Sequence, residues 1–328
     1  MRQISCSEAV REAIAQEMEQ DGRVFLMGED VGVYGGSYGV LKGLVERFGS
    51  ERIRDTPISE AGFVGAAVGA AMTGTRPIVE IMYSDFLLTA MDQIVNQAAK
   101  MQYMFHGAFQ LPLVIRAPSG SGTGAAAQHS QSLEALFTHI PGLKVVAPST
   151  PYDLKGLLIS SIRDTNPVLF LEQKTLYPCM GPVPREFYEI PLGKAKVCRE
   201  GDDVAVITYG RMVHTALDAA RILEERHGIS VHVLDLRSLV PLDEEAVISA
   251  ALRTRRVVIL HEAARNGGFG GELAARIAGH GAVSSLEAPI LRICGRDVPI
   301  PFSRTLEEAA VPSVEEVISR TAELCRHA

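Results

Sequence analysis

The chain has 328 residues, and 32 Lys and Arg against 39 Asp and Glu give it a formal net charge of −7. Hydrophobic residues make up 47% and charged residues 22% of the chain, a balance that excludes intrinsic disorder and low-complexity assembly. The mild acidity leaves no basic stripe that would bind nucleic acid or an anionic membrane surface.

Helices and strands are predicted to alternate along the first half of the chain. Ser5 stands three residues before Glu8, the spacing of a capping box, and apolar residues then recur with helical period up to Met18. Further strands are predicted at 23–28, 52–56, 77–82, 111–117, 144–147 and 167–172, and further helices from residue 58 and over 85–103, 132–137 and 152–163. This alternation indicates parallel βαβ units with helices on both faces of a sheet.

The pattern lapses into prolines around residues 177–191 and then restarts. Strands are predicted at 203–209, 230–236, 256–261 and 289–293, and helices over 213–226, 244–253 and after residue 271. We therefore expect an α/β chain with two parallel-sheet domains, namely a first domain of residues 1–180, a linker of residues 181–200 and a smaller second domain of residues 201–328.

The sequence gives no sign of secretion, of a membrane span or of a disulfide framework. Glu8 stands where a signal peptide needs its apolar segment, so we expect a cytoplasmic protein without a leader. The longest small-apolar stretch, residues 61–72, is too short and too weakly apolar to cross a bilayer. The five cysteines are odd in number and widely scattered, which indicates reduced thiols.

Three glycine-rich segments resemble known motifs without matching their context. Residues 35–39 match the G-x-S-x-G of a nucleophile elbow around Ser37, but the preceding strand ends near Gly28 instead of directly before the turn. Residues 120–124 follow a strand but lack the spacing of a dinucleotide fingerprint, so a flexible active-site loop is the better interpretation. Residues 267–271 precede a helix and either present N–H groups to an anion or form a tight turn for close packing.

Two polar residues are not readily explained by packing alone. Glu60 falls in the first turn of a helix rich in small residues, where it either caps the helix in solvent or lies in an apolar crevice. In the crevice, desolvation would raise its pKa and make it a proton donor to a heteroaromatic nitrogen. His129 lies between a glycine-rich loop and a helix start, a place that suits either a structural histidine or an acid/base group facing a substrate.

Several longer motifs together resemble one family. They cover residues 58–62, 80–86, 92–100, 128–132, 141–146, 148–153, 191–194 and 235–239, in the correct order. They are similar to the β subunit of the thiamine-diphosphate-dependent E1 component of 2-oxo acid dehydrogenase complexes. The resemblance implies a pyrimidine-binding domain followed by a transketolase C-terminal-like domain, and an α2β2 heterotetramer with an α subunit.

The chain lacks half of the cofactor site that this family needs. Thiamine diphosphate enzymes hold the diphosphate through Mg2+ with a Gly-Asp-Gly motif and a downstream Asn. The nearest candidate here is Gly201-Asp-Asp203, and the only asparagines are Asn96, Asn166 and Asn266. On the family pattern the α subunit provides the diphosphate site and the Mg2+ ligands, so we expect the isolated chain to have no turnover.

The resemblance also implies roles for individual residues. Glu60 corresponds to the glutamate that hydrogen-bonds N1′ of the aminopyrimidine, and Met82 and Phe86 match positions that contact that ring. His129 matches the histidine that faces the reacting carbon and assists acyl transfer to the lipoyl group. In related members K+ is held, largely by backbone oxygens, near the positions of Leu113, Ser161, Ile162, Asp164 and Asn166.

The sequence is compatible with three functions. The first is oxidative decarboxylation of pyruvate or a related 2-oxo acid, with transfer of the acyl group to the lipoyl domain of an E2 acyltransferase that docks on the C-terminal domain. The second is cleavage of acetoin by the same chemistry, because residues 102–107 and 124–129 resemble acetoin-enzyme β subunits. The third is a non-catalytic subunit that docks the acyltransferase.

Overall fold

The computed structural model describes residues 1–326, which form two compact units. Unit 1 consists of Met1–Ser119 and Leu136–Leu192, and unit 2 consists of Gly120–Ala135 and the chain from Gly193 onwards. The boundaries expected at residues 180 and 200 do not set the segment Gly120–Ala135 apart. This segment follows a strand of unit 1, yet it packs with unit 2.

The sheet of unit 1 is parallel, as the alternation of elements predicts. Its strands are β2 (Val24–Gly28), β3 (Ile53–Asp55), β4 (Arg76–Glu80), β5 (Val114–Ser119), β6 (Lys144–Val146) and β7 (Val168–Gln173). Within unit 1 they lie in the order β6-β7-β5-β4-β2-β3, and each neighbouring pair is parallel. Every residue of β5 is buried, as expected for a central strand that helices cover on both faces.

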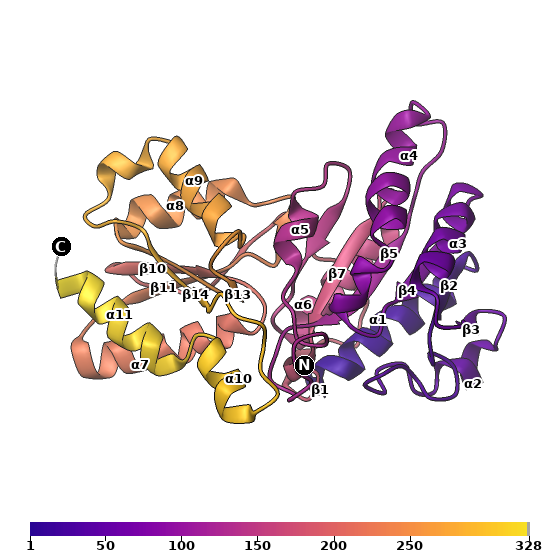
Figure 1. Ribbon diagram of the computed structural model, residues 1–328, viewed down its shortest axis with the longest axis horizontal. Coiled ribbons are helices and arrows are strands. Elements are labelled where there is room, and N and C mark those ends of the chain that lie inside the picture. Colours follow the sequence, from indigo (N-terminus) through magenta and orange to yellow (C-terminus); the bar gives the residue numbers. More distant parts are fainter. Residues whose placement is uncertain (327–328) are drawn as a thin grey trace. The chain divides into compact units, whose positions relative to one another are not determined.

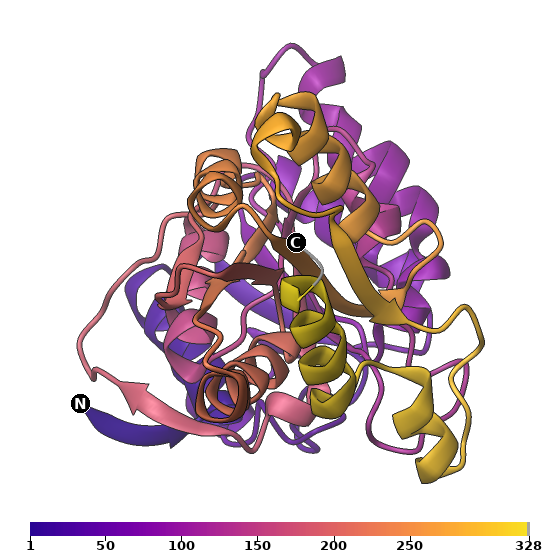
Figure 2. The ribbon, with the colours of Figure 1, turned by 90° about the vertical axis from the view of Figure 1, so that its left-hand side faces the viewer.

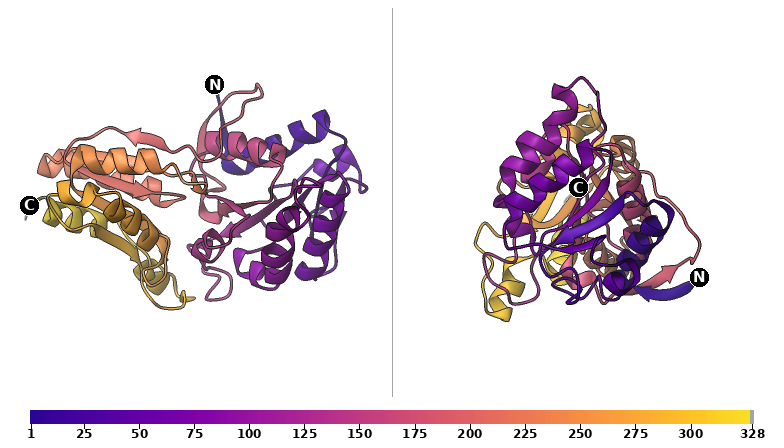
Figure 3. Two further views of the ribbon diagram at one scale, coloured as in Figure 1. Left: turned by 90° about the horizontal axis from the view of Figure 1, so that it is seen from above. Right: turned by 90° about the vertical axis from the view of Figure 1, so that its right-hand side faces the viewer.

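Helices cover both faces of this sheet. Helices α1 (Cys6–Gln20) and α6 (Pro151–Arg163) lie against each other on one face, and α3 (Glu60–Met72) and α4 (Ala99–Met104) lie on the other (Figures 1 and 3). The capping box of α1 is confirmed, since the Glu8 N–H donates to Ser5 Oγ (3.1 Å) and the Ser5 N–H donates to the Glu8 carboxylate (2.7 Å). The smaller elements are β1 (Arg2–Ser5), α2 (Leu44–Phe48), α5 (Glu134–Thr138), η3 (Lys174–Leu176) and β8 (Met180–Val183).

The single helix predicted over residues 85–103 is wrong. The chain instead forms a 3₁₀ helix η1 (Ser84–Leu88), a π-helix η2 (Gln93–Ala98) and then α4. Each of these helices has only five or six residues, little more than one turn, so the spacing of apolar residues cannot tell the helix types apart. A π-helical turn within a helix is frequently found near a functional site.

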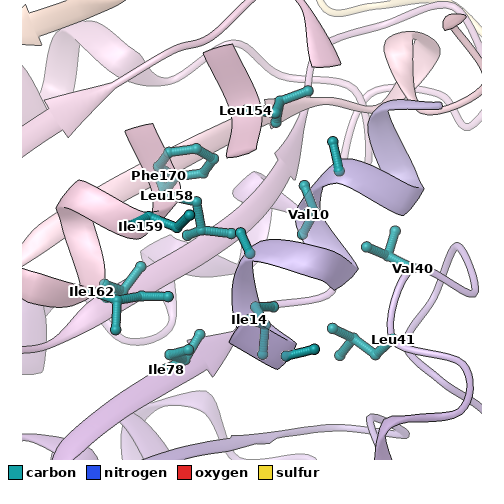
Figure 4. Packing of buried hydrophobic residues seen from close by; sticks show 14 of the residues in the cluster. Val10, Ile14, Val40, Leu41, Ile78, Leu154, Leu158, Ile159, Ile162 and Phe170 are labelled. Atoms are coloured by element: carbon teal, nitrogen blue, oxygen red, sulfur yellow. The ribbon is translucent and has the colours of Figure 1, made fainter. Parts of the chain in front are cut away.

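The core of unit 1 fills the space between the sheet and helices α1 and α6. Figure 4 shows its packing, with labelled side chains Val10, Ile14, Val40, Leu41, Ile78, Leu154, Leu158, Ile159, Ile162 and Phe170. Each of these side chains is at most 3% exposed. Full burial of such a side chain stabilises the fold by roughly 1.5–3 kcal/mol, so this layer holds the sheet edge that carries the candidate site.

Unit 2 is a second α/β sandwich. Its sheet has the order β14-β13-β10-β11-β9, with β9 (Lys196–Arg199) antiparallel and the other pairs parallel. The strands β10 (Val204–Thr208), β11 (Val231–Asp235), β13 (Val257–Ala264) and β14 (Leu291–Gly295) correspond to the predicted ones. Helices α7 (Met212–His227) and α11 (Val314–Arg326) lie side by side on one face, and α8 (Glu244–Thr254) and α9 (Gly270–Gly279) on the other (Figures 1 and 2).

Several elements had no counterpart among the predicted ones. They are β1, α2 and η3 in unit 1, β9 and β8 in or at the edge of the expected linker, and β12 (Ser238–Val240), η4 (Ala282–Ser285), α10 (Arg304–Ala310) and α11 in the second half of the chain. Among the described residues no helix has both the length and the apolarity that a membrane crossing requires. All five cysteines carry free thiols, as expected, and burial raises the pKa of Cys294 to about 11.

Candidate active site

Three of the residues expected to form the site, Glu60, Met82 and Phe86, follow strands of the unit 1 sheet at its carboxyl edge. Strand β2 is parallel to β3 and to β4, and Gly28 is in register with both Asp55 and Glu80. The carboxyl ends of the three strands therefore meet, and the residues after them emerge together. In open α/β sheets this edge is where ligands bind.

Glu60 is the first residue of α3, as the sequence predicts. The helix start makes no side-chain cap, because Ser59 accepts no hydrogen bond from the first turn. Within this chain the Glu60 side chain is half-buried, while Ala61 and Gly62 beside it are exposed. The carboxyl group thus lies at the margin of the chain's own surface, where a ligand or another polypeptide can complete its surroundings.

Glu29 is a further candidate for this site, and no motif in the sequence points to it. It follows β2 directly, is only 4% exposed, and its Oε1 is buried without a hydrogen-bond partner. Burial raises the pKa of the Glu29 carboxyl, and the negative charges of Glu60 and Asp30 raise it further. An unpaired buried carboxyl oxygen near Glu60 fits a ligand that brings its own N–H or proton. The one feature of the sequence that could have indicated Glu29 is its position directly after a strand predicted to be buried.

Met82 and Phe86 follow β4 at the same edge. Met82 comes two residues after the end of β4 and Phe86 lies in η1, and both side chains are half-buried. The Phe86 ring packs edge-on against Tyr83, with ring centroids 5.7 Å apart. A thioether and a fixed aromatic ring with part of their surface uncovered suit contact with a flat heteroaromatic ligand.

A buried ion-pair cluster lies beneath this edge. Arg116 of β5 donates through Nε (2.7 Å) and Nη2 (2.9 Å) to the Glu172 carboxylate and through Nη1 (2.7 Å) to Glu80. Burial raises the pKa of Glu80, although the Arg116 charge acts in the opposite direction. Tyr177 adds a hydrogen bond to Glu172 at 2.8 Å. The cluster ties β4, β5 and β7 together at their carboxyl ends.

The Gly-rich segment after β2 packs on this cluster and is not a nucleophile elbow. A Cβ at Gly36 would lie 2.3 Å from Glu80 Oε1, so only glycine fits there. The Gly32 N–H donates to Asp55 (2.7 Å) and the Ser37 backbone N–H donates to Glu80. No strand runs directly into Ser37, the arrangement that a nucleophile elbow requires.

His129 belongs to unit 2, whereas Glu60, Met82 and Phe86 belong to unit 1. Its side chain is half-buried, and its backbone N–H donates to the Ala126 carbonyl (3.3 Å). Positive φ angles at Gly120, Gly122 and Gly124 (84°, 104° and 67°) explain the glycines of this segment as backbone requirements. These glycines therefore need no dinucleotide ligand to explain them.

The glycine-rich turn at residues 267–271 allows close packing and is not arranged as an anion site. Cβ atoms at Gly268 and Gly270 would lie 2.7 and 2.6 Å from the His261 ring. Burial lowers the pKa of His261 to about 4, so the ring is neutral and part of the core. Glycine is required at these two positions because the His261 ring of β13 occupies the space that a side chain would fill.

The residues expected near K+ lie around the end of α6. The carbonyl oxygens of Ile162 and Asp164 accept hydrogen bonds from Arg76 Nη1 (2.8 and 3.2 Å), and the Asp164 carboxylate pairs with Lys144 (2.5 Å). Carbonyl oxygens at a helix C-terminus attract cations, and Arg76 already occupies two of those in this group. The K+ site at Leu113, Ser161, Ile162, Asp164 and Asn166 stays a prediction.

No diphosphate or Mg2+ site forms at Gly201-Asp-Asp203. Asp202 pairs with Arg253, and Asp203 accepts the Ser230 N–H at 2.7 Å. A Cβ at Gly201 would lie 2.2 Å from the Val231 backbone. Within residues 1–326 no group of three or more His, Cys, Asp or Glu side chains could hold a metal ion.

Comparison with known proteins agrees with this geometry. Residues 2–180 match the transketolase pyrimidine-binding domain family and residues 193–317 match the transketolase C-terminal domain family. A solved "split gene transketolase, inactive beta4 tetramer" has the same fold, with a TM-score of 0.80, 22% identity and 98% of each chain covered. The fold and the two family matches thus define a transketolase-like chain.

Closer relatives narrow the class to one family. The chain is 49% identical to the β subunit of acetoin:2,6-dichlorophenolindophenol oxidoreductase of Bacillus subtilis (98% of this chain, 97% of the relative). It is 47% identical to the 2-oxoisovalerate dehydrogenase β subunit of the same bacterium (99% of each) and 46% identical to the pyruvate dehydrogenase E1 β subunit of Rickettsia felis (98% of each). The chain belongs to the family of E1 β subunits of the 2-oxo acid and acetoin dehydrogenases, as its motifs predict.

Proposed function

We propose that this chain is the β half of a thiamine-diphosphate-dependent E1 enzyme. With an α subunit it decarboxylates a 2-oxo acid, pyruvate in the first place, and transfers the acyl group to the lipoyl domain of an E2 acyltransferase. The observation that carries the proposal is the acid pair at the carboxyl edge of the unit 1 sheet, in which Glu29 has an unpartnered buried oxygen close to Glu60.

The residues of this edge fit the aminopyrimidine end of the cofactor. Glu60 would hydrogen-bond the ring nitrogen N1′, and Met82 and Phe86 would pack against the ring. The negative charge of Glu60 helps Glu29 to keep its proton to a higher pH, so a proton is held beside the ring. When bound, thiamine diphosphate supplies the carbon nucleophile and the electron sink for carbon–carbon cleavage.

The other half of the site is assigned to the α subunit. Asp202 and Asp203, the best local candidates for a diphosphate motif, are used in ion pairs and hydrogen bonds within unit 2. The α subunit would therefore supply the diphosphate contacts and the Mg2+ ligands in an α2β2 assembly. His129 would meet the reacting carbon and assist acyl transfer to the lipoyl group.

Acetoin is the second candidate substrate. Two relatives named for acetoin, from Bacillus subtilis and Cupriavidus necator, are 49% and 48% identical to this chain, against 46% for a pyruvate enzyme. Assays of the assembled α/β enzyme with pyruvate, branched 2-oxo acids and acetoin, at matched enzyme concentration, separate the two. The ratio of kcat/KM values identifies the substrate.

The decisive variant is Glu60→Gln, with Glu51→Gln on the exposed surface as the matched control. Loss of a positioned acid lowers turnover by about 10²- to 10⁴-fold, while co-purification with the α subunit is unchanged. The control keeps both turnover and assembly. Wild-type assembly without turnover on any substrate would instead support the docking-only alternative, and turnover by the isolated chain would contradict the division of the cofactor site.

A further inference from the structure

The segment that carries His129 is fastened to unit 2 by buried polar side chains at three points. The first is Ser121, which is fully buried, and whose N–H (2.6 Å) and Oγ (2.8 Å) both donate to Glu262 Oε1. Arg211 completes this contact by donating to the other Glu262 oxygen (2.5 Å) and to Ser121 Oγ (2.9 Å). The beginning of the segment is thus held by a buried carboxylate with its own counter-charge.

The second point is a glycine turn closed around a carboxylate. The Gly122 N–H donates to Glu307 Oε1 (2.7 Å) and the Gly124 N–H donates to Glu307 Oε2 (3.0 Å). Both glycines have left-handed backbone angles, which turn alternate N–H groups toward one anion. Glu307 is only 3% exposed, so its carboxylate is largely shielded from water by this turn and its own unit.

The third point lies just after His129. Glu134 is buried and accepts a hydrogen bond from the Tyr209 hydroxyl at 2.6 Å. Tyr209 in turn packs on His261, the histidine enclosed by the glycine turn of α9, with ring centroids 6.3 Å apart. His129 therefore lies between anchors on both sides, and each anchor is a side chain from the second half of the chain.

We propose that Glu307 and Glu262 are positioning residues that set the place of His129 from the C-terminal domain. The inference rests on the proposed function only in giving His129 a part in the reaction. A carboxylate that accepts two backbone N–H groups makes charge-assisted bonds, which are stronger than neutral ones and have defined geometry. These bonds hold residues 120–124 in one conformation, so this loop fixes the position of His129 and does not act as a flexible lid.

Hydrogen exchange of the assembled α/β enzyme tests the anchor without any assay of activity. Glu307→Ala and the conservative Glu307→Gln are compared with Glu308→Gln, a neighbour on the surface that pairs with Arg304. Amides in residues 120–130 should exchange about 10- to 100-fold faster in Glu307→Ala, with Glu307→Gln in between and the control unchanged. Wild-type exchange rates in Glu307→Ala would overturn the proposal.

A double-mutant cycle with His129→Ala tests the positioning role. If Glu307 acts through His129, Glu307→Gln lowers turnover in the wild-type background but causes no further loss in His129→Ala. Equal losses in both backgrounds would overturn the proposal, because they would show a general structural effect. Absence of turnover in the wild-type assembly would overturn the proposed function alone, and the exchange experiment would still decide whether the anchor exists.

Discussion

Replacing Arg116 by Leu probes the buried cluster that supports the site edge. Arg116 is 1% exposed and makes hydrogen bonds of 2.7, 2.7 and 2.9 Å to two carboxylates that are themselves at most 5% exposed. Leu fills much of the volume but leaves both carboxylates buried without a counter-charge. We expect the free energy of unfolding to fall by about 3–5 kcal/mol, measured by urea titration at neutral pH.

The pH dependence of this loss gives the sharper test. Without Arg116, burial still raises the pKa of Glu80 above the unfolded value of about 4.3, so the folded variant holds a proton on this carboxyl more tightly than the unfolded chain. This contribution therefore penalises the folded variant more as pH rises, and the deficit relative to wild type shrinks on acidification. Arg221→Leu, which breaks an exposed pair with Glu225, is the control and should cost less than about 1 kcal/mol. A deficit equal to that of the control, or one that grows on acidification, would refute the reasoning.

Three further predictions concern other parts of the chain. Glu29→Gln should stabilise the chain at about pH 8 and give no gain at about pH 4, because the raised pKa of Glu29 penalises only its ionised form; urea titrations at both pH values check this. Gly270→Ala should cost about 1–3 kcal/mol because its Cβ meets His261, whereas Gly279→Ala, with open space around it, should stay within about 1 kcal/mol. If the carbonyl oxygens at the end of α6 bind K+, exchange of K+ for Li+ should lower the thermal midpoint of unfolding, and equal midpoints would count against the site.

The sequence predicted the parts of the site that depend on local pattern. Glu60 was placed at a helix start because small apolar residues follow it directly, and the structure begins α3 at that residue. The parallel sheet followed from apolar runs separated by helical periods, because a strand buried on both faces is mostly apolar. The buried exceptions, Arg116, Glu80 and Glu172, pair with one another. What local pattern could not supply was the type of each helical turn between residues 84 and 104.

The partners of the His129 segment could not have been predicted in this way. Ser121 and Glu262 are 141 positions apart, and Gly122 and Glu307 are 185 positions apart. No period or spacing in a single sequence connects residues at such separations. Glu262 and Glu307 each have one polar and one apolar neighbour in the sequence, and only the fold distinguishes the buried Glu307 from the exposed Glu308 next to it.

The glycine-rich segments show why a motif must be interpreted with its neighbours. Glycine turns resemble phosphate sites because both need bare backbone N–H groups and close approach. Here the segment after β2 packs on Asp55 and Glu80, residues 120–124 close around Glu307, and residues 267–271 enclose His261. Within the described chain each of the three is thus committed to a side chain of its own unit. A diphosphate would have to displace one of these contacts, two of which involve carboxylates that would repel it. Two observations therefore support the proposal that another subunit binds the diphosphate. The glycine-rich segments already contact side chains of this chain, and the chain has no Gly-Asp-Gly motif.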